Sequence, residues 1–312
     1  MLAIVAPGQG AQTPGFLAPW LSLPQFGAGI SRLSEVSGVD LAGYGTEADA
    51  DTIRDTAIAQ PLLVASALLA ARELVLDPAD PTAPIGVTAG HSVGELAAAA
   101  VAGVISDEQA MVLVAERGRA MADAAAATPT SMTAVIGGKP DEVLAAIERH
   151  GLTAANNNGT GQIVAAGTTD QLAALAADPP ARARLIGLSV AGAFHTEHMR
   201  PAVARLGAVA ETMTAREPRT RLLSNADGAV VTDGAEVLRR LVGQVAAPAR
   251  WDLCMATMAE LGVTGLLELP PAGTLTGIAK RNLKGVELFA LNTPDQLADA
   301  QAFVRQHGEG TR

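Results

Sequence analysis

A serine with a glycine two residues away on each side is the residue of this sequence best placed for covalent chemistry. The stretch Gly90-His91-Ser92-Val93-Gly94 fits the G-x-S-x-G pattern of a nucleophile elbow, a sharp strand-to-helix turn that exposes the serine hydroxyl. The flanking residues must be small there because the strand and the helix approach closely. The start of the helix favours negative charge, so the backbone N–H of Val93 could point at an oxyanion.

The same serine also fits a structural pattern. Ser92 and Glu95 match the S-x-x-E capping box, in which the serine closes the start of a helix and performs no chemistry. A capping box does not require glycine on both sides of the serine, so the elbow is the preferred interpretation. The two interpretations are compatible, and residues elsewhere in the chain must decide between them.

A nucleophilic serine needs a base, and His195 is the best candidate among five histidines. It precedes Thr196, a predicted helix N-cap, so it should lie in a loop at the start of a helix, where sites of parallel sheets form. Serine before histidine is also the chain order of elbow enzymes. His195 and His198 could be two ligands of a metal ion, but the sequence offers no evident third ligand for such a site. The remaining histidines lie in the elbow or in segments expected to face solvent: His91, His150 and His307.

Arg117 lies on an apolar face of a well-marked helix. Ser106 and Gln109 form a capping box that starts the helix, which we expect to run from 107 to about 126. The neighbours of Arg117 three and four residues away are all apolar: Leu113, Val114, Ala120 and Met121. A guanidinium on such a face needs an anion. It could form a buried ion pair, extend to solvent, or bind a substrate carboxylate through two parallel hydrogen bonds.

The glycine-rich stretch at 7–15 follows the first predicted strand. It does not fit a dinucleotide loop, because Thr13 stands where the third glycine of G-x-G-x-x-G belongs, and the chain lacks the G-K-[ST] of a phosphate loop. Elbow enzymes take a second oxyanion donor from another strand-end loop, so the backbone N–H of Gln9 is a candidate. A plain turn is the alternative.

Strands alternate with helices along most of the chain. Strands are expected at 2–6 and 85–89, and a helix at 60–76 with Pro61 in its first turn. This alternation predicts an α/β fold with a parallel sheet in an α/β-hydrolase-like core. From 131 the order becomes β-α-β-β-α-β, which is the ferredoxin-like unit. We therefore predict a discontinuous large subdomain, 1–129 and 190–312, with a ferredoxin-like small subdomain, 130–189, inserted into it.

The composition excludes several classes of protein. The 312 residues carry a formal net charge of −10, which argues against general nucleic-acid binding. The single cysteine, Cys254, cannot form an internal disulfide, which fits a reducing cytoplasm. The N-terminal residues do not fit a signal peptide, and the longest apolar run, 96–105, is too short to span a membrane. We expect a soluble cytoplasmic protein, and a monomer by default.

Together these stretches resemble a known family, the malonyl-CoA:acyl-carrier-protein transacylases of fatty acid synthesis and the related acyltransferase domains of polyketide synthases. The resemblance covers nearly the whole chain. Its landmarks, in order, are PGQGAQ, QP at 60–61, GHSVGE, ERGRAM, NNNG near 157, GAFH, SN at 224–225 and GQVAAPARW. The inserted ferredoxin-like unit is also a feature of that family. The excess of alanine, and of arginine over lysine, hints at a GC-rich bacterial genome.

The resemblance implies roles for particular residues. Ser92 would be the nucleophile, His195 its base, and Gln9 and Val93 the backbone donors of the oxyanion hole. Arg117 would hold the malonyl carboxylate. The family has no acidic third member, and the backbone carbonyl of the residue matching Gln244 orients the histidine instead. Further residues expected around the substrate are His91, Met121, Asn156 and Phe194.

The resemblance also implies an acyl preference. In the acyltransferase domains, Ala-Phe-His endings go with malonyl and Ala-Ser-His endings with methylmalonyl. This chain reads Gly192-Ala193-Phe194-His195, and its first position departs from the usual histidine of those domains. Phe194 is bulky and should crowd an α-methyl group, so the chain leans towards malonyl.

The implied reaction is a two-step transfer. Malonyl-CoA acylates the serine, and the phosphopantetheine thiol of an acyl carrier protein then takes the malonyl group, without a cofactor or metal. The carrier is acidic, and Lys280, Arg281 and Lys284 could form a basic patch for it; a solvated helix end is the alternative. Two other functions remain open. One is a serine hydrolase or thioesterase, and the other is a non-catalytic protein that binds coenzyme A esters or the carrier.

Overall fold

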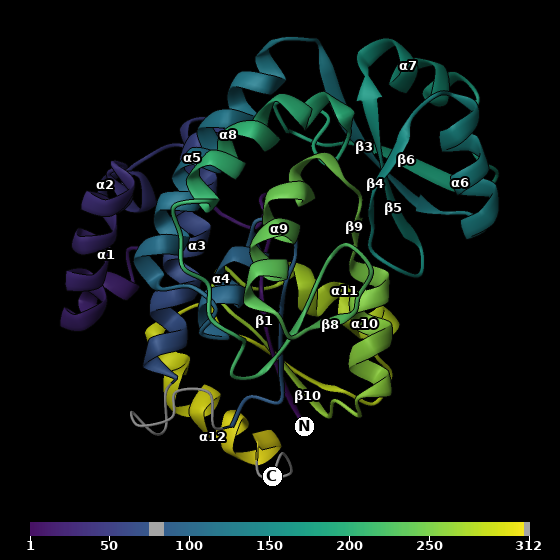
Figure 1. Cartoon of the computed structure of the whole chain (residues 1–312). Coiled ribbons are helices and arrows are strands. Elements are labelled where there is room, and N and C mark those ends of the chain that lie inside the picture. Colours follow the sequence, from purple (N-terminus) through teal and green to yellow (C-terminus); the bar gives the residue numbers. More distant parts are fainter. Residues whose placement is uncertain (75–83, 309–312) are drawn as a thin grey trace.

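The computed structural model describes residues 1–74 and 84–308, and it contains two sheets (Figure 1). The larger sheet has six strands in the order β11-β10-β1-β2-β7-β8. Four pairs of neighbours, from β11 to β7, run parallel, whereas β8 is antiparallel to β7. The carboxyl ends of the parallel strands therefore meet at one edge. The strands are β1 (Leu2–Ala6), β2 (Val87–Gly90), β7 (Arg221–Leu223), β8 (Val230–Val231), β10 (Gly265–Glu268) and β11 (Glu287–Ala290).

Helices cover both faces of this sheet. Alternate residues of β1 face opposite sides: Ile4 packs in the core with α3, α4 and α5, whereas Val5 packs with α10 and α11. Helix α3 is buried on nearly every face, which explains its almost entirely apolar sequence. The helices are α1 (Pro24–Ser37), α2 (Leu41–Thr46), α3 (Thr56–Glu73), α4 (Gly94–Val101), α5 (Asp107–Ala126), α8 (Arg200–Ala210), α9 (Gly234–Gly243), α10 (Trp251–Glu260), α11 (Thr274–Asn282) and α12 (Leu297–Gly308).

The second sheet forms a separate lobe, drawn in teal in Figure 1. Its strands lie in the order β6-β3-β5-β4-β9, and the first four have the antiparallel 4-1-3-2 arrangement of a ferredoxin-like unit. Its elements are β3 (Thr130–Gly137), α6 (Pro140–Arg149), β4 (Thr153–Asn157), β5 (Gln162–Thr168), α7 (Thr169–Ala177) and β6 (Ala183–Gly187). The fifth strand, β9 (Ala249–Arg250), comes from a distant part of the chain and pairs in parallel with β4.

The α/β class and the parallel sheet are confirmed, and helix α5 starts at the predicted capping box. One detail is wrong: α3 begins at Thr56, so Pro61 lies inside the helix and not in its first turn. The last two residues of the predicted helix 60–76 lie outside the described residues. The subdomain boundary at 130–189 stays a prediction, and β9 shows that the small sheet also takes a strand from beyond it. No helix in the described ranges is long and apolar enough to cross a membrane.

Candidate active site

Ser92 lies on a strained turn between the end of β2 and the start of α4. Its φ is +54°, a left-handed conformation that is uncommon for a residue with a side chain. A Cβ on Gly90 would lie 2.0 Å from the backbone of Gly94, and a Cβ on Gly94 would lie 2.3 Å from the carbonyl oxygen of Ala6. Both glycines are therefore required by the close approach of strand and helix, as the elbow pattern predicts.

The capping-box interpretation of this serine is wrong. Helix α4 starts at Gly94, its N-cap is Val93, and no side chain caps it. The Ser92 hydroxyl instead contacts His195, and the Glu95 carboxylate accepts hydrogen bonds from residues outside the helix. The serine side chain is thus free of any structural role in α4.

Replacing Gly94 with alanine should destabilise the protein by about 2–4 kcal/mol, because the new methyl group would clash with fixed backbone on β1. Urea unfolding measures this loss. Gly207→Ala is the matched control, since Gly207 lies in α8 with nothing within 4 Å of the added Cβ. The control should be as stable as the wild type or slightly more stable. Equal stability of both variants would contradict the close-approach argument.

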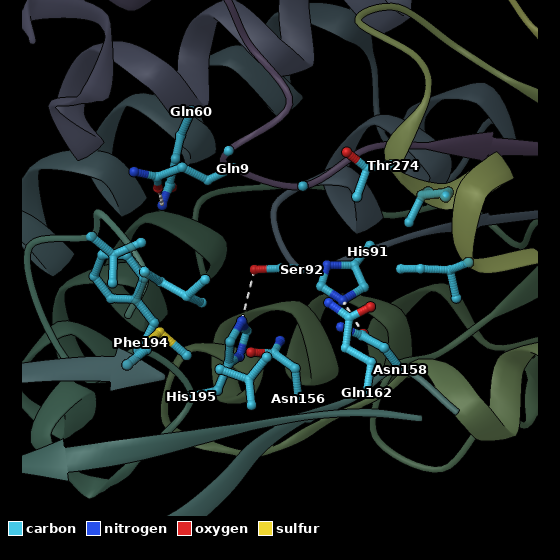
Figure 2. Close-up of a pocket in the computed structure, with 18 of the residues that line it drawn as sticks. Gln9, Gln60, His91, Ser92, Asn156, Asn158, Gln162, Phe194, His195 and Thr274 are labelled. Atoms are coloured by element: carbon cyan, nitrogen blue, oxygen red, sulfur yellow. Dashed lines mark hydrogen bonds between the residues drawn. The ribbon is translucent and has the colours of Figure 1, made fainter. Parts of the chain in front are cut away.

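His195 faces Ser92 from a loop before the 3₁₀ helix η3 (Glu197–Met199). Its Nε2 lies 2.7 Å from Ser92 Oγ (Figure 2). Its Nδ1 lies 2.9 Å from the carbonyl oxygen of Gln244 and 3.2 Å from that of Ala247. Because carbonyl oxygens only accept, Nδ1 must carry the proton, which leaves Nε2 to accept from the serine hydroxyl. The backbone carbonyl expected of Gln244 lies where it can fix this tautomer.

The surroundings keep this imidazole neutral. Burial, followed by the positive charge of Arg117, lowers the pKa of His195 to about 3. The two carbonyl oxygens at Nδ1 act in the opposite direction, but more weakly. A neutral histidine whose free nitrogen faces a hydroxyl is the form that a general base requires.

Arg117 is 2% exposed and lies against the same two residues. Its Nη2 donates to Gln244 Oε1 at 2.8 Å and lies 3.4 Å from Ser92 Oγ. Its Nη1 is buried and has no hydrogen-bond partner, and Arg117 forms no ion pair with any described residue. Burial lowers the pKa of this guanidinium to about 10, while the nearby Glu95 raises it. The structure thus shows neither a direct ion pair nor an extension to solvent, and it leaves N–H groups available for an anion beside the serine.

Ser92 and His195 open into a cavity of about 250 Å³ between the two sheets (Figure 2). Five other residues expected at the site line it from the glycine-rich loop, the elbow, α5, β4 and the loop before η3: Gln9, His91, Met121, Asn156 and Phe194. His91 is held in place because its Nε2 lies 2.9 Å from Asn158 Oδ1. Arg117, Val93 and Gln244 are not among the lining residues, but Arg117 and Gln244 contact Ser92 directly and Val93 follows it in the chain.

The two predicted oxyanion donors have free N–H groups. Within the described part of the chain, neither Gln9 nor Val93 uses its backbone N–H in a hydrogen bond. Gln9 also places its side chain against Arg54 and Thr56, which holds the loop in place. Gln9 lines the same cavity as Ser92, from the loop after β1, and Val93 directly follows the serine in the elbow, which suits a developing oxyanion.

Asn225 is a site residue that sequence reasoning missed. It is fully buried behind the elbow, where its Oδ1 accepts from the Ser92 N–H and its Nδ2 donates to the Gly90 carbonyl, both at 2.8 Å. It therefore satisfies the backbone groups that the strained turn leaves unpaired. The SN pair at 224–225 was a family landmark, but nothing in its local sequence indicated this role.

The three basic residues lie at and just beyond the C-terminal end of α11. Lys280, Arg281 and Lys284 are all exposed. The first turns of the same helix line the cavity through Thr274 and Ile278. Arg281 also donates to Gln162, another lining residue, at 3.1 Å.

His307 differs from expectation. It is buried against Phe303 in α12 and contacts Thr264, because the C-terminal helix packs on the large sheet. No cluster of three or more His, Cys, Asp or Glu residues in the ranges 1–74 and 84–308 could hold a metal ion.

Comparison with known proteins places this geometry in a family. The family description "Acyl transferase domain" matches residues 4–294. The chain belongs to the acyl transferase domain family. It is 50% identical over 306 residues to the malonyl CoA-acyl carrier protein transacylase of Mycobacterium tuberculosis, covering 96% of this chain and all of that protein.

Solved structures agree with this assignment. The crystal structure of the Mycobacterium tuberculosis transacylase has a TM-score of 0.92 and 50% identity, covering 96% of this chain and 99% of that one. A malonyl-transacylase in complex with a type II polyketide acyl-carrier protein has a TM-score of 0.88 and 29% identity, with coverage of 96% and 99%. The α/β-hydrolase-like core and the acyltransferase class are thereby established for this chain.

Proposed function

We propose that this acyl transferase moves the malonyl group of malonyl-CoA to the phosphopantetheine thiol of an acyl carrier protein, through a malonyl ester of Ser92. The observation that carries the proposal is the 2.7 Å contact between Ser92 Oγ and His195 Nε2, beside a buried guanidinium that forms no ion pair with any described residue. The names of the mycobacterial relative and of the carrier-bound transacylase support malonyl as the acyl group and a carrier protein as the acceptor.

In the first half-reaction, His195 Nε2 takes the hydroxyl proton as Ser92 Oγ attacks the thioester carbonyl. The N–H groups of Gln9 and Val93 stabilise the oxyanion of the tetrahedral intermediate. The intermediate collapses, the carbon–sulfur bond breaks, and His195 returns the proton to the departing thiolate of coenzyme A. Arg117 binds the malonyl carboxylate and so fixes the acyl group for attack.

The second half-reaction reverses these roles. His195 takes the proton of the carrier thiol, the sulfur attacks the ester carbonyl, and Ser92 leaves with the proton. Neither half requires a metal or a cofactor bound to this chain. Phe194 lines the cavity next to the base, where its ring would crowd a substituent on the α-carbon and so favour malonyl over methylmalonyl.

Intact-mass measurement after mixing the protein with malonyl-CoA tests the proposal. We expect a single malonyl adduct that persists without acceptor and disappears when the phosphopantetheinylated carrier is added. Steady release of malonate and free coenzyme A without carrier would mean that water is the acceptor, and the protein would then be a thioesterase. Absence of any adduct or turnover would indicate a protein that binds without reacting.

An acidic carrier would dock on the basic end of α11. Reversing one charge, in Lys280→Glu or Lys284→Glu, should raise the KM for the carrier about three- to tenfold, because like charges oppose the approach of an acidic partner. The rise should shrink at high salt. Lys139→Glu is the control, since Lys139 is an exposed lysine at the start of α6 in the small sheet's lobe. An unchanged KM in both α11 variants would place the docking surface elsewhere.

A further inference from the structure

The side chain of Gln244 connects Arg117 to a buried carboxylate. Its Oε1 accepts from Arg117 Nη2 at 2.8 Å. Its Nε2 donates to the Ser92 carbonyl oxygen at 3.0 Å and to Glu95 Oε2. The backbone of the same residue orients His195, but the side chain faces the arginine. The Gln244 carboxamide therefore lies between the Glu95 carboxyl group and the Arg117 guanidinium, next to the backbone of Ser92.

The Ser92 carbonyl, Glu95 and Arg117 together fix which way this carboxamide points. The glutamate is 4% exposed, and its two oxygens accept from two different donors, the backbone N–H of Asn225 at 2.8 Å and the amide of Gln244. The Ser92 carbonyl oxygen can only accept and the Arg117 guanidinium only donates, so the Gln244 NH₂ must face Ser92 and Glu95 and the Gln244 oxygen must face Arg117. Burial raises the pKa of Glu95 to about 7, and in its carboxylate form Glu95 accepts the other NH₂ hydrogen.

Glu95 is the buried acidic group whose negative charge acts on Arg117. It forms no direct ion pair with any residue in the described ranges, but its charge raises the pKa of the Arg117 guanidinium across the intervening amide. The other buried carboxylate in those ranges, Glu268, differs because three backbone N–H groups at the start of α11 satisfy it: those of Gly273, Leu275 and Thr276. Glu268 therefore has a local capping role, whereas Glu95 faces the site.

We propose that Glu95 and the side-chain amide of Gln244 are positioning residues that hold the Arg117 guanidinium against the nucleophile and thereby set the preference for acyl groups with a terminal carboxylate. This inference rests on the proposed function, in which Arg117 binds the malonyl carboxylate. Neither residue touches the substrate. Each acts through the arginine, so the effect should appear in acyl selectivity and leave the serine–histidine chemistry largely intact.

The change Glu95→Gln tests the amide argument at constant shape. A glutamine has one accepting oxygen, and the fixed backbone N–H of Asn225 requires it. The new NH₂ then faces the NH₂ of Gln244. If the Gln244 amide keeps its place, two donors oppose each other; if it turns, its oxygen faces the Ser92 carbonyl and its NH₂ faces the Arg117 guanidinium. Both arrangements disturb the hydrogen bond that holds Arg117. Gln244→Met removes the amide at similar volume and keeps the backbone carbonyl that holds His195.

Both variants should be assayed for acylation by malonyl-CoA and by acetyl-CoA, which lacks the carboxylate. We expect the ratio of the two kcat/KM values to fall at least tenfold in each variant, mainly through the malonyl KM. Glu268→Gln is the matched control for a buried carboxylate: any loss from looser packing should affect both acyl groups equally and leave the ratio unchanged. Combined with Arg117→Ala, Glu95→Gln should lower the ratio no further.

The outcomes separate the inference from the function on which it rests. If Arg117→Ala lowers the ratio and Glu95→Gln and Gln244→Met do not, the positioning role is wrong and the proposed function stands. If Arg117→Ala itself leaves the ratio unchanged, the arginine does not hold the carboxylate and both fail. Equal losses of kcat/KM with both acyl donors in Glu95→Gln would mean that Glu95 has only a structural role. Thermal unfolding of each variant identifies that case as a lowered unfolding temperature.

Discussion

Replacing Ser92 with alanine should abolish the malonyl adduct and lower malonyl transfer by at least about a thousandfold. In the proposed mechanism both half-reactions pass through the ester on Oγ, so no route to the carrier remains except direct attack of its thiol on malonyl-CoA. The fold should survive, because the Ser92 hydroxyl contacts His195 and Arg117 and caps no helix. Intact mass gives the adduct, and carrier acylation gives the rate.

Ser106→Ala is the matched control for this variant. Ser106 caps α5, so its loss should cost about 1 kcal/mol of stability and leave both adduct and rate nearly unchanged. A persistent adduct on the Ser92→Ala protein would move the nucleophile elsewhere, and peptide mapping of that adduct would locate it. Retained transfer without any adduct would instead indicate that the carrier thiol attacks the thioester carbonyl of malonyl-CoA directly and releases coenzyme A, with no covalent intermediate on the protein.

Replacing Arg117 with alanine should lower kcat/KM for malonyl-CoA by about a hundred- to a thousandfold and for acetyl-CoA by less than about tenfold. Charge-assisted hydrogen bonds to a buried carboxylate contribute about 3–4 kcal/mol, and each 1.4 kcal/mol is a factor of ten. Acetyl-CoA lacks the carboxylate, so its kcat/KM falls only because the site loses the positive charge of Arg117, which is the smaller effect. Steady-state kinetics with the two acyl donors measures the difference.

Arg119→Ala controls for the loss of an arginine from the same helix. Its guanidinium is exposed and interacts with Glu116 at 3.4 Å, a surface pair worth little. We expect its kinetics to match the wild type with both donors. Equal losses with malonyl and acetyl in Arg117→Ala would remove the role of carboxylate binding and leave the arginine as a structural or electrostatic element.

Local patterns predicted the parts of the site that depend on neighbouring residues. The two glycines of the elbow follow from the close approach of adjacent segments, and the burial of Arg117 follows from apolar neighbours one helical turn away. The capping box of Ser106 and Gln109 also involves only neighbouring residues, and α5 begins where it predicted. His195 could be selected among the five histidines because its position just before a helix start is also visible in the local sequence.

The missed contacts join residues far apart in the chain. Asn225 supports Ser92 across 133 positions, and the Gln244 amide reaches Glu95 across 149. Such pairings depend on how the sheet is assembled, so no periodic pattern in the sequence predicts them. The capping box assigned to Ser92 failed for a related reason, since the distant partners His195 and Asn225 take the groups that a cap would use.

The short strand β9 connects the backbone that holds His195 to the sheet of the small lobe. The carbonyl oxygens of Gln244 and Ala247 hold the imidazole, and two residues later the same backbone pairs with β4 at Asn156 and Asn157. A shift of the small sheet would therefore move the carbonyl oxygens that hold His195, so the geometry of the serine–histidine pair depends on how the two lobes are joined through β9.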